Sequence, residues 1–336
     1  MNRYITALFT VAAGVILLPA LPVYIAGRRE VPEEIPPVAE TAPESPVSTE
    51  SSFRVLDINT GKVLDVPLRD YLIGAAAAEM PVSFEPEAIR AQVVAAHTYA
   101  LRQCLRERQS PTPELGGADF SNDTSKYQGY FTEKEMRRCY GTCYDANIGK
   151  LAAAVDEVMP YVLTYGGEPI IAAFHSMSPG RTESAGDVWG TPVDYLVPVD
   201  SSADTSAPRY TEEARFPEPV LRKRLTEAFP EIRLGSDPSK WIVVGETTES
   251  GTVLTALAGD RSVTGNELRE ALGLRSACFT VEGTEDGITV TTRGFGHGVG
   301  LSQYGADAMA KEGHSWREIL EHYYPGCTIE AADMSP

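Results

Sequence analysis

The chain has 336 residues, of which 43% are hydrophobic and 23% are charged, and its formal net charge is −18. This length allows about two domains with a full hydrophobic core, and the composition excludes wholesale disorder, a collagen-like rod and a polytopic membrane protein. The acidic balance argues against nucleic acid as a partner, because phosphate groups repel the chain and few cations are present to release condensed counterions.

The N-terminal segment 4–27 is nearly all apolar and has arginines on both sides. About 20 apolar residues suffice to cross a bilayer as a helix. We therefore expect residues 1–29 to form a short cytoplasmic stub and a single membrane anchor, with the bulk of the chain outside the cytoplasm. A cleaved signal peptide is the alternative, because prolines interrupt the apolar run, although Tyr24 and Ala26 make a poor cleavage site.

The next segment, residues 30–52, contains five prolines and six glutamates but no lysine or arginine. Proline stiffens a chain toward an extended form, and like charges spread it further. The composition predicts an acidic tether that holds a globular part away from the membrane.

The globular part is expected to begin with a β-hairpin, because two β-rich runs, 53–58 and 63–66, flank an Asn-Thr-Gly-Lys turn. A helix over 71–80 follows, with Asp70 as its expected cap. A second helix over 86–108 has apolar residues at helical spacing and is expected to lie in the core.

Helices and strands alternate irregularly after a polar loop at 116–130. We expect helices at about 147–158, 266–272, 302–312 and 316–324, the last of them capped by Ser315. Strands are expected at 161–165, 169–175, 241–244, 253–257, 278–282 and 288–292, and a loop over 179–208. Without a regular βαβ rhythm, α+β is the better fold class. We expect one globular unit over 53–330, leave open a smaller subdomain at about 205–285, and expect a tail at 331–336.

Glu79 is the first candidate for chemistry, because it follows the four alanines 75–78 near the end of a predicted helix. A carboxyl group surrounded by small apolar side chains loses hydration, so its pKa should rise, as a general acid requires. The alternative is a solvated glutamate at a helix end, which is the commoner situation.

A second candidate is the loop that starts at His175, at the end of a predicted strand. His175, Ser176 and Ser178 could bind a polar substrate. They could also suggest a Ser–His nucleophile pair, although neighbouring residues of a strand point to opposite faces. The alternative to both is that the Ser, Pro and Gly residues of this loop only form a turn.

The third candidate is the glycine-rich stretch 293–305, which follows a predicted strand and opens a helix. Its glycines would let the backbone approach a ligand closely, and His297 stands unobstructed among them. The spacing fits neither a dinucleotide fingerprint nor a P-loop. A buried structural loop is the alternative.

Metal-binding patterns are weak in this sequence. Cys139 and Cys143 could form a disulfide, half of a metal site or an incidental pair, and His314 and His322 are not spaced for a metal. The five cysteines are odd in number, so at least one thiol is free or pairs with another chain. We expect no metal and no cofactor.

Several motifs occur together in one order between about residues 53 and 330. They are Tyr71-Leu72-Ile73-Gly74, Ala77-Ala78-Glu79-Met80-Pro81, Ala88-Ile89-Arg90-Ala91-Gln92, His175-Ser176, Asp187-Val188-Trp189-Gly190, Ala271-Leu272-Gly273-Leu274-Arg275-Ser276, Gly296-His297-Gly298-Val299-Gly300 through Gly305, and His322-Tyr323-Tyr324-Pro325-Gly326. Through these motifs the chain resembles the stage II sporulation protein D family (SpoIID), which shares its domain with an amidase-enhancer group.

The resemblance implies a lytic transglycosylase of peptidoglycan that acts in septal wall remodelling and engulfment during sporulation. Such an enzyme cleaves the bond between N-acetylmuramic acid and N-acetylglucosamine and leaves a 1,6-anhydro product. Glu79 would be the catalytic acid and base. The substrate-binding residues implied in this way are His97, His175, Ser176, Ser178, His297, Gly298, Ser302, Gln303 and Tyr304.

The resemblance also implies partners and a location. The substrate would be glycan strands stripped of stem peptides. The family works with an amidase, stage II sporulation protein P, and with a membrane protein, M. The globular part would lie in the space between the mother-cell and forespore membranes.

The sequence departs from the family pattern at three places. His97 stands where the family often has arginine, and it carries a charge only when protonated. Met177-Ser178-Pro179-Gly180 replaces the favoured Thr-Ser-Gly-Gly. The stretch 121–128 lacks the Cys and His residues with which some relatives bind zinc. The first two departures leave open a non-catalytic peptidoglycan-binding activator of a wall amidase. A serine or cysteine hydrolase is a weaker alternative, because it needs a base within hydrogen-bond reach of Ser176, Ser178 or a cysteine.

Overall fold

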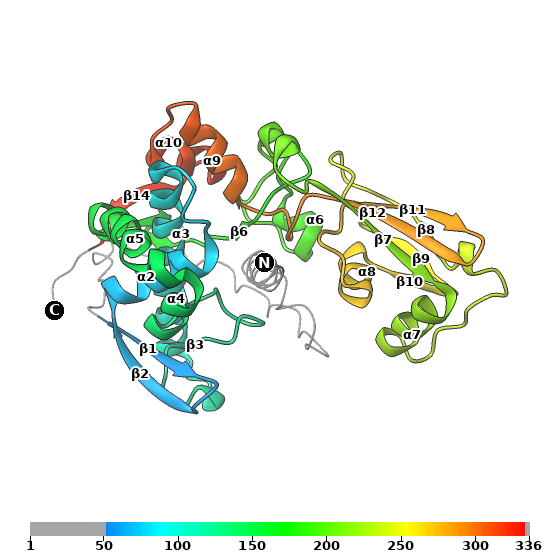
Figure 1. Ribbon diagram of the computed structural model, residues 1–336, viewed down its shortest axis with the longest axis horizontal. Helices are drawn as coiled ribbons and strands as arrows, with labels where there is room; N and C mark the ends of the chain where they lie inside the picture. Colours follow the sequence, from blue (N-terminus) through cyan, green and yellow to red (C-terminus); the bar gives the residue numbers. More distant parts are fainter. Residues whose placement is uncertain (1–51, 333–336) are drawn as a thin grey trace, which may run out of the picture. The chain divides into compact units, whose positions relative to one another are not determined.

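The computed structural model describes residues 52–332. The predicted anchor, most of the predicted tether and most of the tail therefore lie outside the described residues. Between residues 52 and 332, no helix combines the length and the apolar character needed to cross a bilayer. The chain mixes helices and strands, as expected for an α+β protein (Figure 1).

The described residues form two compact units. The first unit contains residues 52–172 and 327–332, and the second contains residues 173–326. The segment 205–285, for which a subdomain was left open, lies within the second unit.

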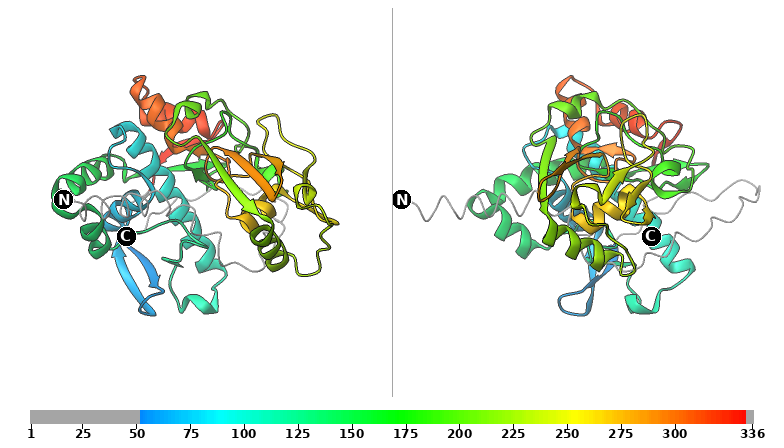
Figure 2. Two further views of the ribbon diagram at one scale, coloured as in Figure 1. Left: turned by 45° about the vertical axis from the view of Figure 1, so that its right-hand side comes forward. Right: turned by 90° about the vertical axis from the view of Figure 1, so that its right-hand side faces the viewer.

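The first unit begins with the predicted hairpin. Strands β1 (Ser52–Asp57) and β2 (Lys62–Pro67) pair antiparallel, and Figure 2 shows this hairpin, in blue, extending from the helices of the unit. Strand β3 (Phe120–Ser121) joins β1 in parallel. It lies in the stretch predicted to be a loop, because a two-residue strand carries no periodic signal.

Four α-helices follow in the first unit: α2 (Leu68–Glu79), α3 (Pro86–Gln109), α4 (Glu133–Tyr140) and α5 (Tyr144–Val158). The core positions predicted for α3, among them Ile89 and Val93, are fully buried. Asp70 was wrongly predicted as a cap, because α2 starts two residues earlier and Pro67 precedes it. Helix α4 begins with a capping box between Thr132 and Glu135, a signal that the sequence analysis missed.

A small sheet in the first unit joins distant parts of the chain. Strand β4 (Tyr161–Tyr165) pairs antiparallel with β5 (Glu168–Pro169) and with β14 (Thr328–Ala331). The C-terminal strand therefore returns to the unit in which the described chain begins. The short 3-10 helices η2 (Pro113–Leu115) and η3 (Gly141–Cys143) complete this unit.

The second unit contains two antiparallel three-stranded sheets with a shared hydrophobic core. One sheet has the order β11 (Phe279–Thr284), β12 (Gly287–Arg293), β7 (Thr211–Pro217), and the other has the order β10 (Arg261–Val263), β9 (Ala256–Ala258), β8 (Ile242–Val244). Helices α7 (Glu218–Ala228) and α8 (Gly265–Leu272) pack against each other, and leucines from both join this core (Figure 1). The 3-10 helix η5 (Pro238–Lys240) precedes β8.

The remainder of the second unit carries the histidine loops. Strand β6 (Phe174–His175) pairs in parallel with β13 (Leu301–Ser302), so residues more than 120 positions apart lie side by side. Around this pair lie α6 (Ala185–Trp189), η4 (Ser202–Ser206), α9 (Gln303–Lys311) and α10 (Trp316–Tyr323). Ser315 caps α10 through a capping box, as its position predicted.

Candidate functional site

Glu79 is the last residue of α2. The next residue, Met80, is extended because it precedes Pro81, and a residue before proline is disfavoured in the helical region. Ala75, Ala76 and Ala77 are buried, and the Glu79 side chain is partly buried. The alanine run thus places a single carboxyl group at the end of a closely packed helix.

The carboxyl group of Glu79 accepts a hydrogen bond from the backbone of a distant loop. The N–H of Gly129 donates to Oε1 with an N···O distance of 2.5 Å. Burial raises the pKa of Glu79 to about 7, and the hydrogen bond from Gly129 opposes that rise without cancelling it. Near neutral pH the group is therefore present both as an acid and as a carboxylate, which matches the sequence prediction of a raised pKa.

The loop that carries Gly129 is tied to α2 and α3. Nε2 of Gln128 donates to the hydroxyl of Tyr71 at 2.7 Å and to the backbone oxygen of Ala96 at 3.0 Å. The N–H of Phe131 donates to the backbone oxygen of Gly74 at 3.1 Å. These bonds position the Gly129 amide against Glu79. The sequence predicted a loop here but gave it no role in the site.

Lys150 on α5 holds the chain that follows Glu79. Its Nζ donates to the backbone oxygens of Val82 at 2.7 Å and Phe84 at 2.5 Å. A single ammonium group thus satisfies two carbonyls of the irregular turn between α2 and α3.

His97 lies in the middle of α3 and is 1% exposed. Burial lowers its pKa to about 4, so the ring is neutral at physiological pH. A contact between this ring and a substrate would require the surrounding chain to open. The position that the resemblance assigned to substrate binding is therefore occupied here by a core side chain.

In the second unit, His175 is 4% exposed and neutral, because burial lowers its pKa to about 4. Its Nδ1 lies 3.2 Å from the backbone oxygen of Val299, so that nitrogen carries the hydrogen. Nε2 has no hydrogen-bond partner. Neither nitrogen contacts a serine hydroxyl, and the Ser–His pair considered above is not formed.

His297 lies on the glycine-rich loop beside His175. The two ring centroids are 5.6 Å apart, and the ring of Trp189 on α6 lies 5.5 Å from His297. The N–H of Val299 donates to Nδ1 of His297, so Nε2 carries the hydrogen in the neutral ring. The backbone pairing of β6 with β13 thus brings two predicted site residues together.

Gly298 is held by Glu183, which the sequence analysis did not single out. The N–H of Glu183 donates to the backbone oxygen of Gly298 at 2.7 Å. The Glu183 side chain is 2% exposed and accepts a hydrogen bond from Thr248, and burial raises its pKa. Gly298 has a φ of +81°, a conformation that favours glycine.

Asp204 organises the predicted serines of the second unit. It is completely buried and accepts hydrogen bonds from the N–H of Ser178 at 2.7 Å and from the hydroxyls of Ser201 at 2.9 Å and Ser302 at 2.8 Å. Sequence reasoning missed Asp204, because a lone aspartate in a loop carries no motif.

The other predicted residues surround this network. The N–H of Tyr304 donates to the backbone oxygen of Ser176 at 3.0 Å. Ser176 and Gln303 are buried, whereas Tyr304 is partly exposed. The second unit therefore gathers the predicted residues from 175 onward, while Glu79 and His97 belong to the first unit.

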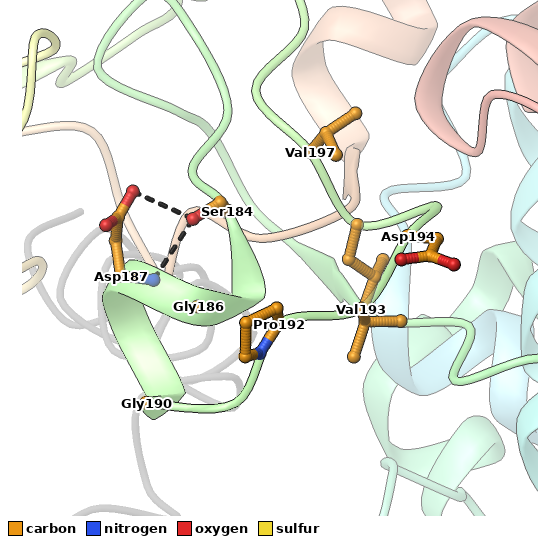
Figure 3. A pocket seen from close by; sticks show the side chains of 9 residues that line it. Ser184, Gly186, Asp187, Gly190, Pro192, Val193, Asp194 and Val197 are labelled. Atoms are coloured by element: carbon orange, nitrogen blue, oxygen red, sulfur yellow. Dashed lines mark hydrogen bonds between the residues drawn. The ribbon is translucent and has the colours of Figure 1, made fainter. Parts of the chain in front are cut away.

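A shallow hollow of about 540 Å³ lies beside α6 in the second unit (Figure 3). Pro192, Val193 and Val197 form its apolar part, and the carboxyl group of Asp187 is hydrogen-bonded to Ser184. None of the predicted site residues lines it.

Metal and disulfide possibilities are limited in residues 52–332. No group of three or more His, Cys, Asp or Glu side chains in this range could hold a metal ion. None of the five cysteines, all of which lie in this range, is in a disulfide, so Cys139 and Cys143 are not joined.

The chain is similar to known proteins over most of its length. A family model described as stage II sporulation protein matches residues 57–165. Stage II sporulation protein D of Bacillus subtilis (strain 168) is 38% identical over 295 residues, which cover 88% of this chain and 82% of that protein. The protein of the same name from Bacillus amyloliquefaciens is 37% identical over 87% of this chain and 81% of its own length.

A more distant relative has a different description. The amidase enhancer of Bacillus subtilis (strain 168) is 28% identical over 310 residues, which cover 77% of this chain and 40% of that protein. The two proteins of higher identity match over most of both lengths, and the matched span includes Glu79 and its surroundings. The chain therefore belongs to the stage II sporulation protein D family.

Proposed function

We propose that this chain is a peptidoglycan lytic transglycosylase that remodels the septal wall during engulfment, with Glu79 as its catalytic acid and base. The observation that carries the proposal is the partly buried Glu79 carboxyl group, whose pKa of about 7 lets it donate and accept a proton near neutral pH. Family membership supports the sporulation role.

The reaction needs only one such group. Protonated Glu79 gives its proton to the oxygen between N-acetylmuramic acid and N-acetylglucosamine as the bond from that oxygen to C1 breaks. The 6-hydroxyl oxygen of the same muramic residue then bonds to C1, and the Glu79 carboxylate takes the hydroxyl proton. The nucleophile is part of the substrate, so proximity supplies much of the rate.

The predicted binding residues of the second unit then divide into two roles. His297 and Tyr304 are partly exposed, and we propose that their side chains contact the glycan. His175, Ser176, Ser178, Gly298, Ser302 and Gln303 are buried and shape the loops that present those contacts. We further propose a membrane-anchored chain that acts on strands already stripped of stem peptides, beside the amidase P and the membrane protein M.

The test is product analysis. The full chain is incubated with glycan strands lacking stem peptides, and the products are analysed by mass spectrometry. Wild type should release fragments with 1,6-anhydromuramic ends, and Glu79→Gln should release none. Glu114→Gln, which changes an exposed carboxyl group of the same unit, should behave as wild type. Absence of anhydro ends from the wild-type reaction would refute the proposal.

The second candidate is a non-catalytic activator of a wall amidase. It is favoured by the relative described as an amidase enhancer. In that case the chain would bind glycan strands without cleaving them, and a wall amidase would release stem peptides faster in its presence. Glu79→Gln would then leave the stimulation unchanged.

A further inference from the structure

We infer that the backbone N–H of Gly129 positions the carboxyl group of Glu79 by binding Oε1, and thereby directs the acidic proton to Oε2. The amide nitrogen lies 2.5 Å from Oε1, within hydrogen-bond reach, and the two residues are 50 positions apart in the sequence. The catalytic consequence rests on the proposed function. The placement of the proton does not.

Glycine at position 129 leaves room for the Glu79 carboxyl group. A Cβ there would lie 2.8 Å from Oε1 of Glu79 and 3.1 Å from Cβ of Ala78. The first distance is shorter than a carbon–oxygen contact allows, so a side chain at 129 would displace the carboxyl group. The absence of a side chain is what lets the amide reach its acceptor.

The segment 127–131 is held rigidly enough to serve as a fixed donor. Besides the bonds of Gln128 and Phe131 described above, the ring of Tyr130 stacks on Tyr71, with centroids 5.2 Å apart and an interplanar angle of 16°. A Cβ on Gly74 would come within 2.5 Å of both Phe131 O and Tyr130 Cε2, which shows how closely the segment lies on α2. A donor held from several sides needs no reorganisation when charge develops on its acceptor.

The two oxygens of Glu79 are therefore not equivalent. In the neutral acid, the oxygen that accepts from an N–H is the carbonyl oxygen, so Oε1 is that oxygen and Oε2 bears the hydrogen. When Oε2 gives its proton away, the negative charge strengthens the bond from Gly129. The amide thus stabilises the form of Glu79 that appears only after proton transfer.

Two tyrosines interact electrostatically with Glu79, namely Tyr71 and Tyr99. Burial raises the pKa of both hydroxyls, that of Tyr99 to about 12, so both are neutral in the pH range in which Glu79 titrates. The Gly129 amide is hydrogen-bonded to the Glu79 carboxyl group, so its NMR signal should report the ionisation of that group.

The first test leaves the fold intact. The full chain is labelled with ¹⁵N-glycine, and the Gly129 amide signal is identified by its loss in Gly129→Ala. Its proton shift should move downfield with a midpoint near pH 7 as Glu79 ionises, and the movement should vanish in Glu79→Gln. A Gly129 signal that does not titrate, or that titrates equally in Glu79→Gln, would overturn the inference.

The second test compares two glycine-to-alanine variants. Gly129→Ala should raise the Glu79 pKa, measured by ¹³C NMR of labelled glutamate carboxyl groups, because the ionised form loses its donor. Gly149→Ala is the matched control, since it lies in α5 of the same unit with nothing within 4 Å of the new Cβ. An unchanged or lowered pKa in Gly129→Ala would contradict the inference.

Product analysis separates this inference from the proposed function. In an active enzyme, Gly129→Ala should form anhydro products on the order of 100-fold more slowly at pH 7, as expected for a displaced catalytic group. The alkaline limb of its pH profile should move by the same amount as the Glu79 pKa. If wild type forms no anhydro products but the amide titrates as expected, the proposed function fails and the placement of the proton stands.

Discussion

Oγ of Ser302 donates a 2.8 Å hydrogen bond to Oδ1 of Asp204, 98 positions away in the sequence. The same Oγ accepts from the N–H of Gly305 and caps α9. Asp204 also accepts from the N–H of Ser178, in the loop that follows His175. One buried carboxylate therefore joins the end of the glycine-rich loop to the histidine–serine loop.

Asp204→Ala should destabilise the protein strongly. It removes the carboxyl group to which three buried groups donate, and each donor left unsatisfied costs about 1–3 kcal/mol. Asp204→Asn keeps an acceptor oxygen and should cost less. Urea unfolding measures both, with Asp187→Ala as the control, because Asp187 is exposed and its carboxyl group accepts from Ser184 alone. Equal losses in Asp204→Ala and Asp187→Ala would contradict the role of this network.

The cleavage rate should depend on pH through Glu79. The proton donor must be protonated in the free enzyme, so the rate should fall as pH rises through the Glu79 pKa of about 7. Above that value the decline should approach tenfold per pH unit, as for any single general acid. The rate of anhydro product formation between pH 5.5 and 9 tests this, and a rate that stays constant across pH 7 would exclude Glu79 as the acid.

Glu79 should make the protein less stable as pH rises, whereas a glutamate whose pKa is lowered by folding has the opposite effect. Its pKa is raised from 4.5 to about 7, so the folded chain binds a proton that the unfolded chain has lost between these values. The contribution of this proton to the free energy of unfolding is complete below pH 4.5 and is lost as pH rises through 7. The loss is about 2 kcal/mol after allowance for partial solvent screening. Glu79→Gln should remove this part of the pH dependence in urea unfolding.

The two buried histidines should make the protein sensitive to mild acid. The pKa values of His97 and His175 are lowered from 6.5 to about 4, so the unfolded chain takes up protons in this interval that the folded chain does not. The stability present above pH 6.5 is therefore lost as pH falls toward 4, by about 2 kcal/mol per histidine at pH 5.

Unfolding free energies at pH 7.5 and pH 5 check this expectation. The difference between the two values should shrink in His97→Gln and in His175→Asn. It should remain in His314→Gln, because His314 is exposed. A difference that is the same in all four proteins would show that the buried rings do not cause the acid sensitivity.

Lys150→Met should loosen the turn behind Glu79. The variant keeps the aliphatic stem but leaves the backbone oxygens of Val82 and Phe84 without their donor. We expect a loss of about 1–3 kcal/mol in unfolding free energy and a slower formation of anhydro products, because Glu79 is less well placed. Lys134→Met, on the exposed side of α4, serves as the control. Identical product rates in the two variants would argue against a positioning role for Lys150.

Local patterns predicted the local elements of this protein. The hairpin turn, the apolar spacing of α3 and the cap at Ser315 are read from neighbouring residues, and the structure has these elements. They could be predicted because backbone geometry and capping depend on residues within a few positions of each other. The motif order likewise pointed to the family, and the comparisons confirmed it.

The contacts between distant residues were decided by the tertiary structure. Gly129 with Glu79, Asp204 with Ser302 and the pairing of β6 with β13 join segments separated by 50, 98 and more than 120 positions. Short strands such as β3 and lone residues such as Asp204 carry no periodic signal. Their roles depend on which buried hydrogen-bond donor lies next to which acceptor in the folded chain. A buried polar group must be paired because it has lost contact with water, and burial itself is a result of the tertiary structure.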